Sequence, residues 1–420
     1  MFQHEVLDIL FLICVIGMWA ILFYHSFLLI TAYDFFLKSR ARLQKYLKDF
    51  SDPPFVTVLI PAHNEEIVIE RTLQAMLELD YPRDRIEIVP LNDNSSDRTG
   101  EILDRFASKY RRVRPVHIAP GVGGKGKSHA LNLGLKQARG DVICVYDADN
   151  SPEPNALKYL VAELVSDPKL AVVCGKVRTQ NRKKNLLTRF INLEFISHQW
   201  MVQGGRYHLH GIATIPGTNF VVWKKVLDYL GGWDTRALTE DTELSLQIQE
   251  LGYRISFNPF SITWEQEPET VPVWFRQRLR WLQGNQYIVQ KYFRPDRFKL
   301  KNVRVVLYMV LVYALLLWSL IISDLIFVGG VIGLLKVTVA GPLVLTWMMA
   351  FFLFVISICV TLTFEETSEF TLENIGIAVL MYFTYCQMWI VLSVWSMIAG
   401  LGNRKGRPFW SKTQRFHLQK

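Results

Sequence analysis

Apolar and polar positions divide the chain into a central region of short alternating segments and long apolar segments towards both ends. Short apolar runs with the length and β-branched content of strands occur at Phe55–Ile60, Ile86–Leu91, Val113–Ile118, Val142–Tyr146 and Ala171–Val177. Helical patterns lie between them at Glu65–Leu79, Gly100–Lys109 and Ser128–Ala138. This alternation predicts a Rossmann-like α/β domain with a mostly parallel sheet and right-handed crossovers.

The first long apolar segment, Val6–Ala32, is long enough to cross a hydrocarbon core about 30 Å thick at 1.5 Å per residue. It has no cleavage site of small residues, so we expect an uncleaved anchor, not a signal peptide. Basic residues follow it and predict that the N-terminus lies outside and the central region in the cytosol. They are Lys38, Arg40, Arg42, Lys45 and Lys48.

Three apolar stretches follow the central region. Val303–Leu335 and Val337–Thr363 are each long enough to span, and two spans return the chain to the cytosol. Leu372–Gly400 contains several polar side chains and precedes a basic tail, Asn403–Pro408. Because a third span would place this tail outside, we interpret Leu372–Gly400 as an in-plane interfacial helix, and a third span is the alternative.

These patterns predict five parts of a multi-pass protein of the cell membrane. They are an N-terminal anchor over 1–35, a cytosolic α/β domain over 36–270, interfacial helices over 271–302, two transmembrane helices over 303–371, and an interfacial helix with a cytosolic tail over 372–420.

Composition agrees with a membrane protein. Half of the 420 residues are hydrophobic and the net charge is +9, which we interpret mainly as a positive-inside bias. No nucleic-acid-binding motif occurs, so no nucleic-acid partner is expected. The five cysteines have no short spacing that would suggest a zinc or redox site, and reduced cysteines suit a cytosolic domain.

Carboxylates follow two of the predicted strands. Asp147 and Asp149 come directly after the run that ends at Tyr146. Two carboxylates this close can hold one hard cation, Mg²⁺ or Mn²⁺, which would bridge a diphosphate; a solvated loop is the alternative. After the second strand, Asp93 is a candidate ligand for a base or ribose, and Asp97 is a candidate N-cap of the following helix.

Two motifs nearer the C-terminus suggest acceptor chemistry. Thr239-Glu-Asp241 opens a predicted helix, where acidic residues favour the macrodipole, but Asp241 could also remove a proton from an acceptor hydroxyl. Gln277, Arg280 and Trp281 lie in a basic, aromatic segment. Arginine pairs with phosphate and tryptophan stacks on a sugar face, whereas snorkelling of an interfacial helix is the structural alternative.

One motif indicates a different enzyme class. Gly121–Ser128 matches the phosphate-loop pattern G-x-x-x-x-G-K-[ST] after a short strand and before a helix, as in a P-loop NTPase. Its position after two complete βα units is unusual for such enzymes, and an NTPase leaves Asp241 and Gln277 unexplained. The compatible alternative is a backbone-rich loop with Lys127 facing the phosphate of a donor.

Taken in order, these motifs resemble those of the family 2 inverting glycosyltransferases with a GT-A fold. The likeness is greatest to the processive membrane subgroup of poly-N-acetylglucosamine, hyaluronan, chitin and cellulose synthases. It covers Pro53–Phe293 and, more loosely, the tail. Gly126–Asn132 resembles the family's G-K-x-x-A-L-N segment, which accounts for the apparent phosphate loop. Asn92 departs from the family's Asp-Asp pair.

The resemblance implies a role for each motif. It implies a metal site at Asp149 and Asp147, catalysis by Asp241 with Glu240, and contacts of Gln277, Arg280 and Trp281 with the acceptor and diphosphate. The implied nucleotide-sugar site is Pro61, Ala62, Asn64, Glu65, Asp93, Lys127 and Asp147. The tail resembles a gating loop with Trp410, Lys412 and Thr413.

The implied activity is that of a processive membrane hexosyltransferase. It would transfer a sugar from UDP-GlcNAc or a UDP-hexose to a growing polysaccharide with inversion and export, using Mg²⁺ or Mn²⁺. The implied partners are the nucleotide-sugar donor, a glycan or lipid acceptor, membrane lipid and accessory export subunits. A non-processive glycolipid synthase, a P-loop NTPase and a partner subunit with a decayed site are the alternatives.

Overall fold

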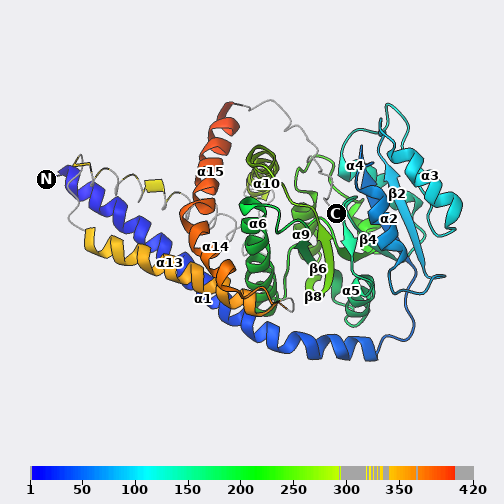
Figure 1. Ribbon diagram of the computed structural model, residues 1–420, viewed down its shortest axis with the longest axis horizontal. Coiled ribbons are helices and arrows are strands. Elements are labelled where there is room, and N and C mark those ends of the chain that lie inside the picture. Colours follow the sequence, from blue (N-terminus) through cyan, green and yellow to red (C-terminus); the bar gives the residue numbers. More distant parts are fainter. Residues whose placement is uncertain are drawn as a thin grey trace.

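The computed structural model describes residues 2–292, 294, 318, 321, 322, 325, 329, 332, 333, 340–365 and 368–402. An α/β domain is built on one eight-stranded sheet, and the long first helix and the C-terminal helices extend from it to one side (Figure 1). The strands are β1 (Val56–Ala62), β2 (Ile86–Asn92), β3 (Val116–His117), β4 (Val142–Val145), β5 (Ser151–Pro152), β6 (Leu170–Thr179), β7 (Phe220–Trp223) and β8 (Arg254–Glu265).

The sheet has the order β3-β2-β1-β4-β7-β6-β8-β5. The prediction of a mostly parallel sheet is right for β3-β2-β1-β4 and for the β6-β8 pair, and wrong for the pairings of β7 and β5. β7 lies antiparallel to both β4 and β6, and β5 lies antiparallel to β8, so the sheet is mixed. The sequence pattern missed β7 because it is short, and β8 because Asn258, Pro259 and Ser261 interrupt its apolar run.

Helices cover both faces of the sheet. They are α1 (Phe2–Lys48), α2 (Ile69–Leu77), α3 (Thr99–Lys109), α4 (Lys127–Gln137), α5 (Ala156–Val165), α6 (Leu186–Ser197), the π-helix η1 (His198–Gly204), α7 (Gly205–His210), α8 (Lys224–Leu230), α9 (Glu240–Glu250), α10 (Val271–Tyr292), α13 (Ala340–Thr363), α14 (Leu372–Phe383) and α15 (Tyr385–Gly402). The side chains of β1 alternate between two cores: Val58 belongs to the core that includes residues of α2, α3 and α5, and Leu59 belongs to the core that includes residues of α4, α6 and α9.

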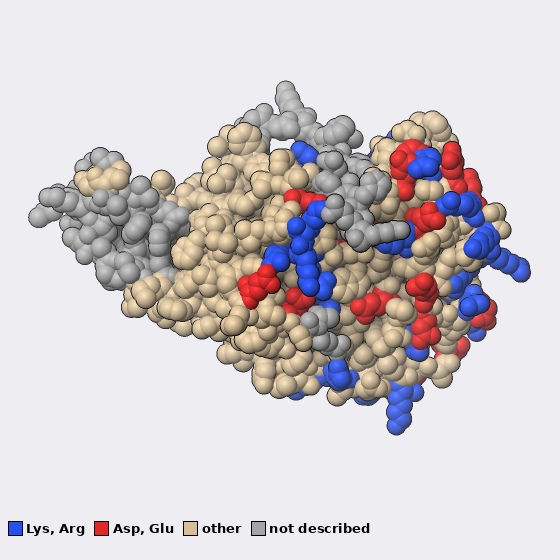
Figure 2. Space-filling view, in the orientation of Figure 1, with Lys and Arg blue, Asp and Glu red and all other residues tan. Residues whose placement is uncertain are grey.

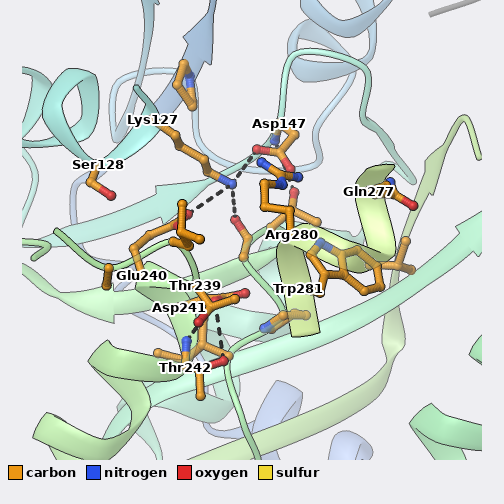
Figure 3. A pocket seen from close by; sticks show the side chains of 18 of the residues that line it. Lys127, Ser128, Asp147, Thr239, Glu240, Asp241, Thr242, Gln277, Arg280 and Trp281 are labelled. Atoms are coloured by element: carbon orange, nitrogen blue, oxygen red, sulfur yellow. Dashed lines mark hydrogen bonds and ion pairs between the residues drawn. The ribbon is translucent and has the colours of Figure 1, made fainter. Parts of the chain in front are cut away.

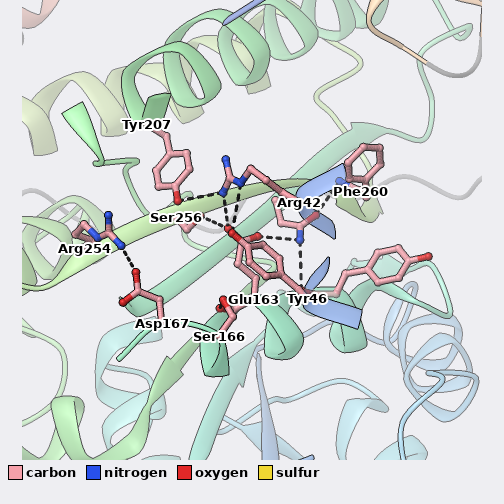
Figure 4. A network of polar contacts seen from close by, with 11 residues as sticks. Arg42, Tyr46, Glu163, Ser166, Asp167, Tyr207, Arg254, Ser256 and Phe260 are labelled. Carbon is pink, nitrogen blue, oxygen red and sulfur yellow. Dashed lines mark hydrogen bonds and ion pairs between the residues drawn. The ribbon is translucent and has the colours of Figure 1, made fainter. Parts of the chain in front are cut away.

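The first helix is one continuous element that runs past the predicted boundary at residue 35 and packs on the α/β domain. Phe35 is fully buried in the larger core. Two turns later, Arg42 donates from Nη2 to Glu163 Oε1 (3.0 Å) and to the Tyr207 hydroxyl (3.1 Å) (Figure 4). Asn258 Nδ2 donates to the other oxygen of Glu163 at 2.9 Å. This buried network fixes α1 to α5, α7 and β8.

Two helices among the described residues are long and apolar enough to cross a membrane, namely Leu12–Lys48 and Leu372–Ile398. The second bends at Thr384, between α14 and α15. Figure 2 shows that the end of the molecule where α1 and α13 extend from the α/β domain has a broad face with no acidic or basic side chains among the described residues. Most of the predicted span 303–335 lies outside the described residues, and whether 372–400 crosses a membrane or lies in its plane stays a prediction.

Candidate active site

Strand pairing brings the polar motifs together at one edge of the sheet. β1 pairs with β2 so that Ala62 lies opposite Asn92, and β1 pairs with β4 so that Leu59 lies opposite Val145. The loops after these three strands therefore leave the sheet side by side. β7 runs the opposite way, with Phe220 opposite Val145, so the turn that precedes β7 reaches the same edge.

A cavity of about 1220 Å³ opens at this edge and continues towards η1 and α10. Most of the residues predicted from sequence line it: Pro61, Ala62, Glu65, Asp93, Lys127, Asp147, Asp149, Glu240, Asp241, Gln277, Arg280 and Trp281. Asn64 does not line the cavity; its Oδ1 accepts from the Ser96 backbone N–H at 2.7 Å and thereby holds the neighbouring loop. Trp410, Lys412 and Thr413 lie outside the described residues.

The Asp147–Asp149 segment is held by its backbone, which leaves the carboxylates directed at the cavity. The Asp147 N–H donates to Thr218 Oγ1 at 3.0 Å, and the Thr218 hydroxyl donates to Asn150 Oδ1 at 2.6 Å. From the other side, the Thr72 hydroxyl donates to the Ala148 carbonyl at 2.7 Å. The segment is thus fixed by α2 and the turn before β7, which are far away in the sequence.

Lys127, at the first turn of α4, connects the acidic groups of the cavity (Figure 3). Its Nζ lies 2.6 Å from Asp147 Oδ1 and 3.7 Å from Glu240 Oε1, and donates to the Gly217 carbonyl at 2.7 Å. Burial disfavours the ammonium, but the carboxylates of Asp147 and Glu240 outweigh burial and raise the pKa of Lys127. Lys127 therefore stays charged, where it can also attract a phosphate.

Asp241 lies at the start of α9, one residue after Glu240. Its Oδ1 accepts from the Thr242 N–H at 2.7 Å, which orients the carboxylate (Figure 3). Burial, followed by repulsion from Glu240, raises the pKa of Asp241 to about 7. A carboxylate with such a pKa accepts protons near neutral pH far more readily than an exposed aspartate does.

The glycine-rich loop before α4 packs on the second strand. The Gly124 N–H donates to Asp93 Oδ1 at 2.7 Å, so Asp93 helps to shape this loop as well as facing the cavity. Asp97 Oδ1 accepts from the Thr99 N–H at 3.0 Å, but the N-cap of α3 is Arg98, so Asp97 lies one residue before the cap position that the sequence predicted for it.

The three predicted residues of α10 share their helix with a buried arginine that the sequence analysis did not single out. The guanidinium of Arg278 lies over the Trp281 ring, 4.1 Å from its centre, and pairs with Glu194 Oε2 on α6 at 2.9 Å. The Tyr385 hydroxyl of α15 donates to the same carboxylate at 2.8 Å and accepts from Trp274 Nε1 at 2.9 Å. This network sets the position of Trp281 in the cavity.

Sequence reasoning also missed Glu265 and His198, which line the cavity. Burial, and then Glu267 and Asp149, raise the pKa of Glu265. Burial lowers the pKa of His198 to about 4, with Arg206 and Arg278 adding to the effect, so this ring is neutral. Two features of the sequence could have indicated these buried polar groups. Glu194 is a lone carboxylate inside the apolar run of α6, and Glu265 and Glu267 are two carboxylates separated by one residue.

The site suits a divalent cation that is shared with a ligand. Asp147 and Asp149 offer hard oxygen donors at the wall of the cavity, and Asp149 is almost fully buried. No cluster of three or more His, Cys, Asp or Glu side chains that could hold a metal occurs among the residues that the structure describes. Asp147 and Asp149 would hold such an ion, and further oxygen donors would have to come from a bound ligand or water.

Comparison with known proteins gives the family. The family model described as "Glycosyltransferase like family 2" matches residues 53–284. The chain is 47% identical to a probable glycosyltransferase, YdaM, of Bacillus subtilis, with 98% of this chain and 99% of that protein covered. It is 30% identical to a poly-β-1,6-N-acetyl-D-glucosamine synthase of Staphylococcus epidermidis, with 69% and 70% covered.

A solved structure shares the fold. It is a mannosyltransferase of Pyrobaculum calidifontis in complex with GDP-Man and Mn²⁺, with a TM-score of 0.57 at 21% identity, and 90% of this chain and 98% of that one covered. This likeness identifies the α/β domain as a GT-A fold. The match of the family model over residues 53–284 shows that the chain belongs to glycosyltransferase family 2.

Proposed function

We propose that this protein is a processive membrane hexosyltransferase that extends a polysaccharide from a UDP-sugar, UDP-GlcNAc or a UDP-hexose, with inversion. The observation that carries the proposal is that Lys127 contacts both Asp147 and Glu240, next to Asp241, in one cavity that Trp281 also lines. The similarity to a poly-β-1,6-N-acetyl-D-glucosamine synthase supports a UDP-GlcNAc donor and a polymeric product.

In this mechanism Asp241 removes the proton from the acceptor hydroxyl as that oxygen attacks the anomeric carbon. Because burial raises the pKa of Asp241 to about 7, the carboxylate is a stronger base than an ordinary aspartate. Attack opposite the leaving diphosphate inverts the anomeric configuration. Trp281, backed by the Arg278 guanidinium, offers a flat face for the acceptor sugar.

The departing diphosphate needs positive charge. Lys127 and Arg280 supply it from the protein, and in Figure 3 both side chains point to the region of Asp147. Asp147 and Asp149 would hold Mg²⁺ or Mn²⁺, and such an ion would neutralise charge on the diphosphate. When the donor binds, Lys127 would exchange its contact with Asp147 for one with phosphate.

The apolar helices support an attachment to the membrane. α1 carries an apolar segment followed by basic residues, and α13 and the α14–α15 pair expose apolar side chains, among them Phe352, Phe383 and Trp395. We propose that the α/β domain faces the cytosol and that the product is exported past these helices.

The test uses membranes that contain the full chain, a panel of radiolabelled nucleotide sugars, and Mg²⁺ or Mn²⁺. A long product from UDP-GlcNAc or a UDP-hexose is expected, and its loss on addition of a chelator would support the metal site. Asp241→Asn should abolish transfer while donor binding persists. A product of one added sugar would instead indicate a glycolipid synthase, and normal turnover of Asp241→Asn would rule out this base.

A further inference from the structure

A second cavity, of about 340 Å³, lies on the other side of β6 from the active site. Successive side chains of a strand point to opposite faces, so Gly175 and Val177 line the active-site cavity while Lys176 and Arg178 line the second one. The remaining walls come from α1, η1, β8 and the residues at the end of α13, and include Leu37, Arg40, Trp200, Phe260, Phe364 and Glu365.

This cavity lies where two apolar helices become polar. The apolar run of α1 gives way to Lys38 and Arg40, and the apolar helix α13 ends at Thr363 and is followed by Glu365. The rings of Phe36 and Phe364 stack with their centres 4.6 Å apart, so the two helices meet at this level. In a chain whose helices cross a membrane, such a level coincides with the lipid headgroups.

The lining has the chemistry of a site for an anion with an apolar neighbour. Arg40, Lys176 and Arg178 are cationic, and Glu365 is the one carboxylate among the lining residues that the structure describes. Glu365 contacts both Lys176 and Arg178 and accepts from Trp200 Nε1 at 2.6 Å, which holds the two buried cations in place. The lining is therefore net positive.

Arg40 differs from the two buried cations. It is exposed at the mouth of the cavity, where its guanidinium carbon lies 6.0 Å from the centre of the Phe260 ring. The neighbouring side chain of Leu37 is 58% exposed, so a cationic group lies next to an apolar surface at the mouth of the cavity. A phosphate held by Arg40 would leave attached acyl chains against α1 and α13.

We propose that this cavity binds the phosphate headgroup of an anionic phospholipid, with Arg40 as the contact at its mouth. The proposal rests on the membrane attachment proposed above, but not on the identity of the donor or acceptor. Because β6 contributes to both cavities, a bound headgroup would also fix the strand that carries Gly175 and Val177 along the active site.

The test is lipid binding by the full chain purified in a neutral detergent. The thermal midpoint is followed against phosphatidylglycerol, phosphatidylcholine, and glycerol 1-phosphate, which has the same phosphate without acyl chains. We expect saturable stabilisation by phosphatidylglycerol and at least about tenfold weaker effects of the other two. Equal stabilisation by phosphatidylcholine would overturn the proposal, and equal binding of glycerol 1-phosphate would overturn the lipid assignment in favour of a site for free phosphate.

Arg40→Gln and Lys38→Gln form a matched pair. Both remove one positive charge from the same turn of α1, but Lys38 does not line the cavity and is 60% exposed. We expect Arg40→Gln to weaken phosphatidylglycerol binding about five- to tenfold and Arg40→Glu to abolish it, since a charge near an anionic lipid contributes about 1 kcal/mol. Lys38→Gln should bind as the unaltered chain does.

Equal losses in the two Gln variants would show general attraction to anionic lipid and refute a defined site. Because binding is measured without any sugar, a wrong donor assignment would leave this result unaffected. Conversely, a chain that binds phosphatidylglycerol but makes no glycan would contradict only the proposed activity.

Discussion

Asp241, the proposed catalytic base, would link catalysis to stability in a way that can be measured. Burial, with repulsion from Glu240, raises the pKa of its carboxyl from an ordinary 3.8 to about 7. The folded chain therefore binds this proton more tightly than the unfolded chain does. The stability that the proton contributes is fully present below pH 3.8 and is lost as the pH rises to about 7.

The size of the effect follows from the two pKa values. At about 1.36 kcal/mol for each pKa unit, ionising Asp241 in the folded chain costs up to about 4 kcal/mol, of which roughly 2–3 kcal/mol is lost between pH 5 and pH 8. An amide side chain at this position could not ionise. The Tm of Asp241→Asn relative to that of the unaltered chain should therefore rise by about 5–10 °C from pH 5 to pH 8, for a domain of this size.

The assay compares the thermal unfolding of both proteins at pH 5 and pH 8 in the same detergent and salt, alongside sugar transfer. Asp234→Asn is the control of opposite sign. Burial alone would raise the pKa of Asp234, but Arg236 and Lys291 lower it to about 2. Its loss should therefore destabilise the chain equally at both pH values. A difference in Tm between Asp241→Asn and the unaltered chain that does not change with pH would refute the reasoning.

Three further outcomes are expected. Arg42→Met should lower the free energy of unfolding by about 3–5 kcal/mol, because it leaves the buried Glu163 carboxylate without its guanidinium partner. The control Arg105→Met breaks an exposed ion pair with Glu70 at 2.7 Å and should cost under about 1 kcal/mol. Equal shifts of the denaturation midpoint in the two variants would contradict this prediction. Gly217→Ala should reduce kcat at least about tenfold, because φ is +86° and the new Cβ would lie 3.0 Å from Asp241 Oδ2. Gly231→Ala, at φ +77° with nothing within 4 Å, should keep kcat, and similar rates for the two variants would argue against crowding of the base. Finally, log kcat/KM should fall with unit slope below about pH 7 as Asp241 takes up its proton, and a decline that begins only below about pH 5 would exclude Asp241 as the titrating base.

The phosphate-loop pattern shows how a literal motif can mislead. Gly121–Ser128 has the required spacing, but membership of glycosyltransferase family 2 contradicts the NTPase hypothesis. In the structure, Lys127 faces the carboxylates of Asp147 and Glu240, and Asp93 holds Gly124. The same short pattern therefore serves a different site, because the surroundings of the lysine decide what it binds.

The sequence by itself determined which segments become strands β1, β2, β4 and β6, and it placed polar motifs at the carboxyl ends of the first three. These features depend on local hydrophobic runs and on the rule that parallel strands present their ends at one edge. The family followed from the order of the motifs, and the match over residues 53–284 confirms it.

Only the tertiary structure decided how the second half of the sheet completes the site. β7 inserts antiparallel between β4 and β6, which brings Gly217 to Lys127 and Thr218 to Asp147. Likewise, Arg278 supports Trp281 only because Glu194 of α6 and Tyr385 of α15 meet it there. Such contacts join residues that are distant in the chain, and no local pattern of apolar and polar positions specifies which distant partner a short strand or a buried charge will find.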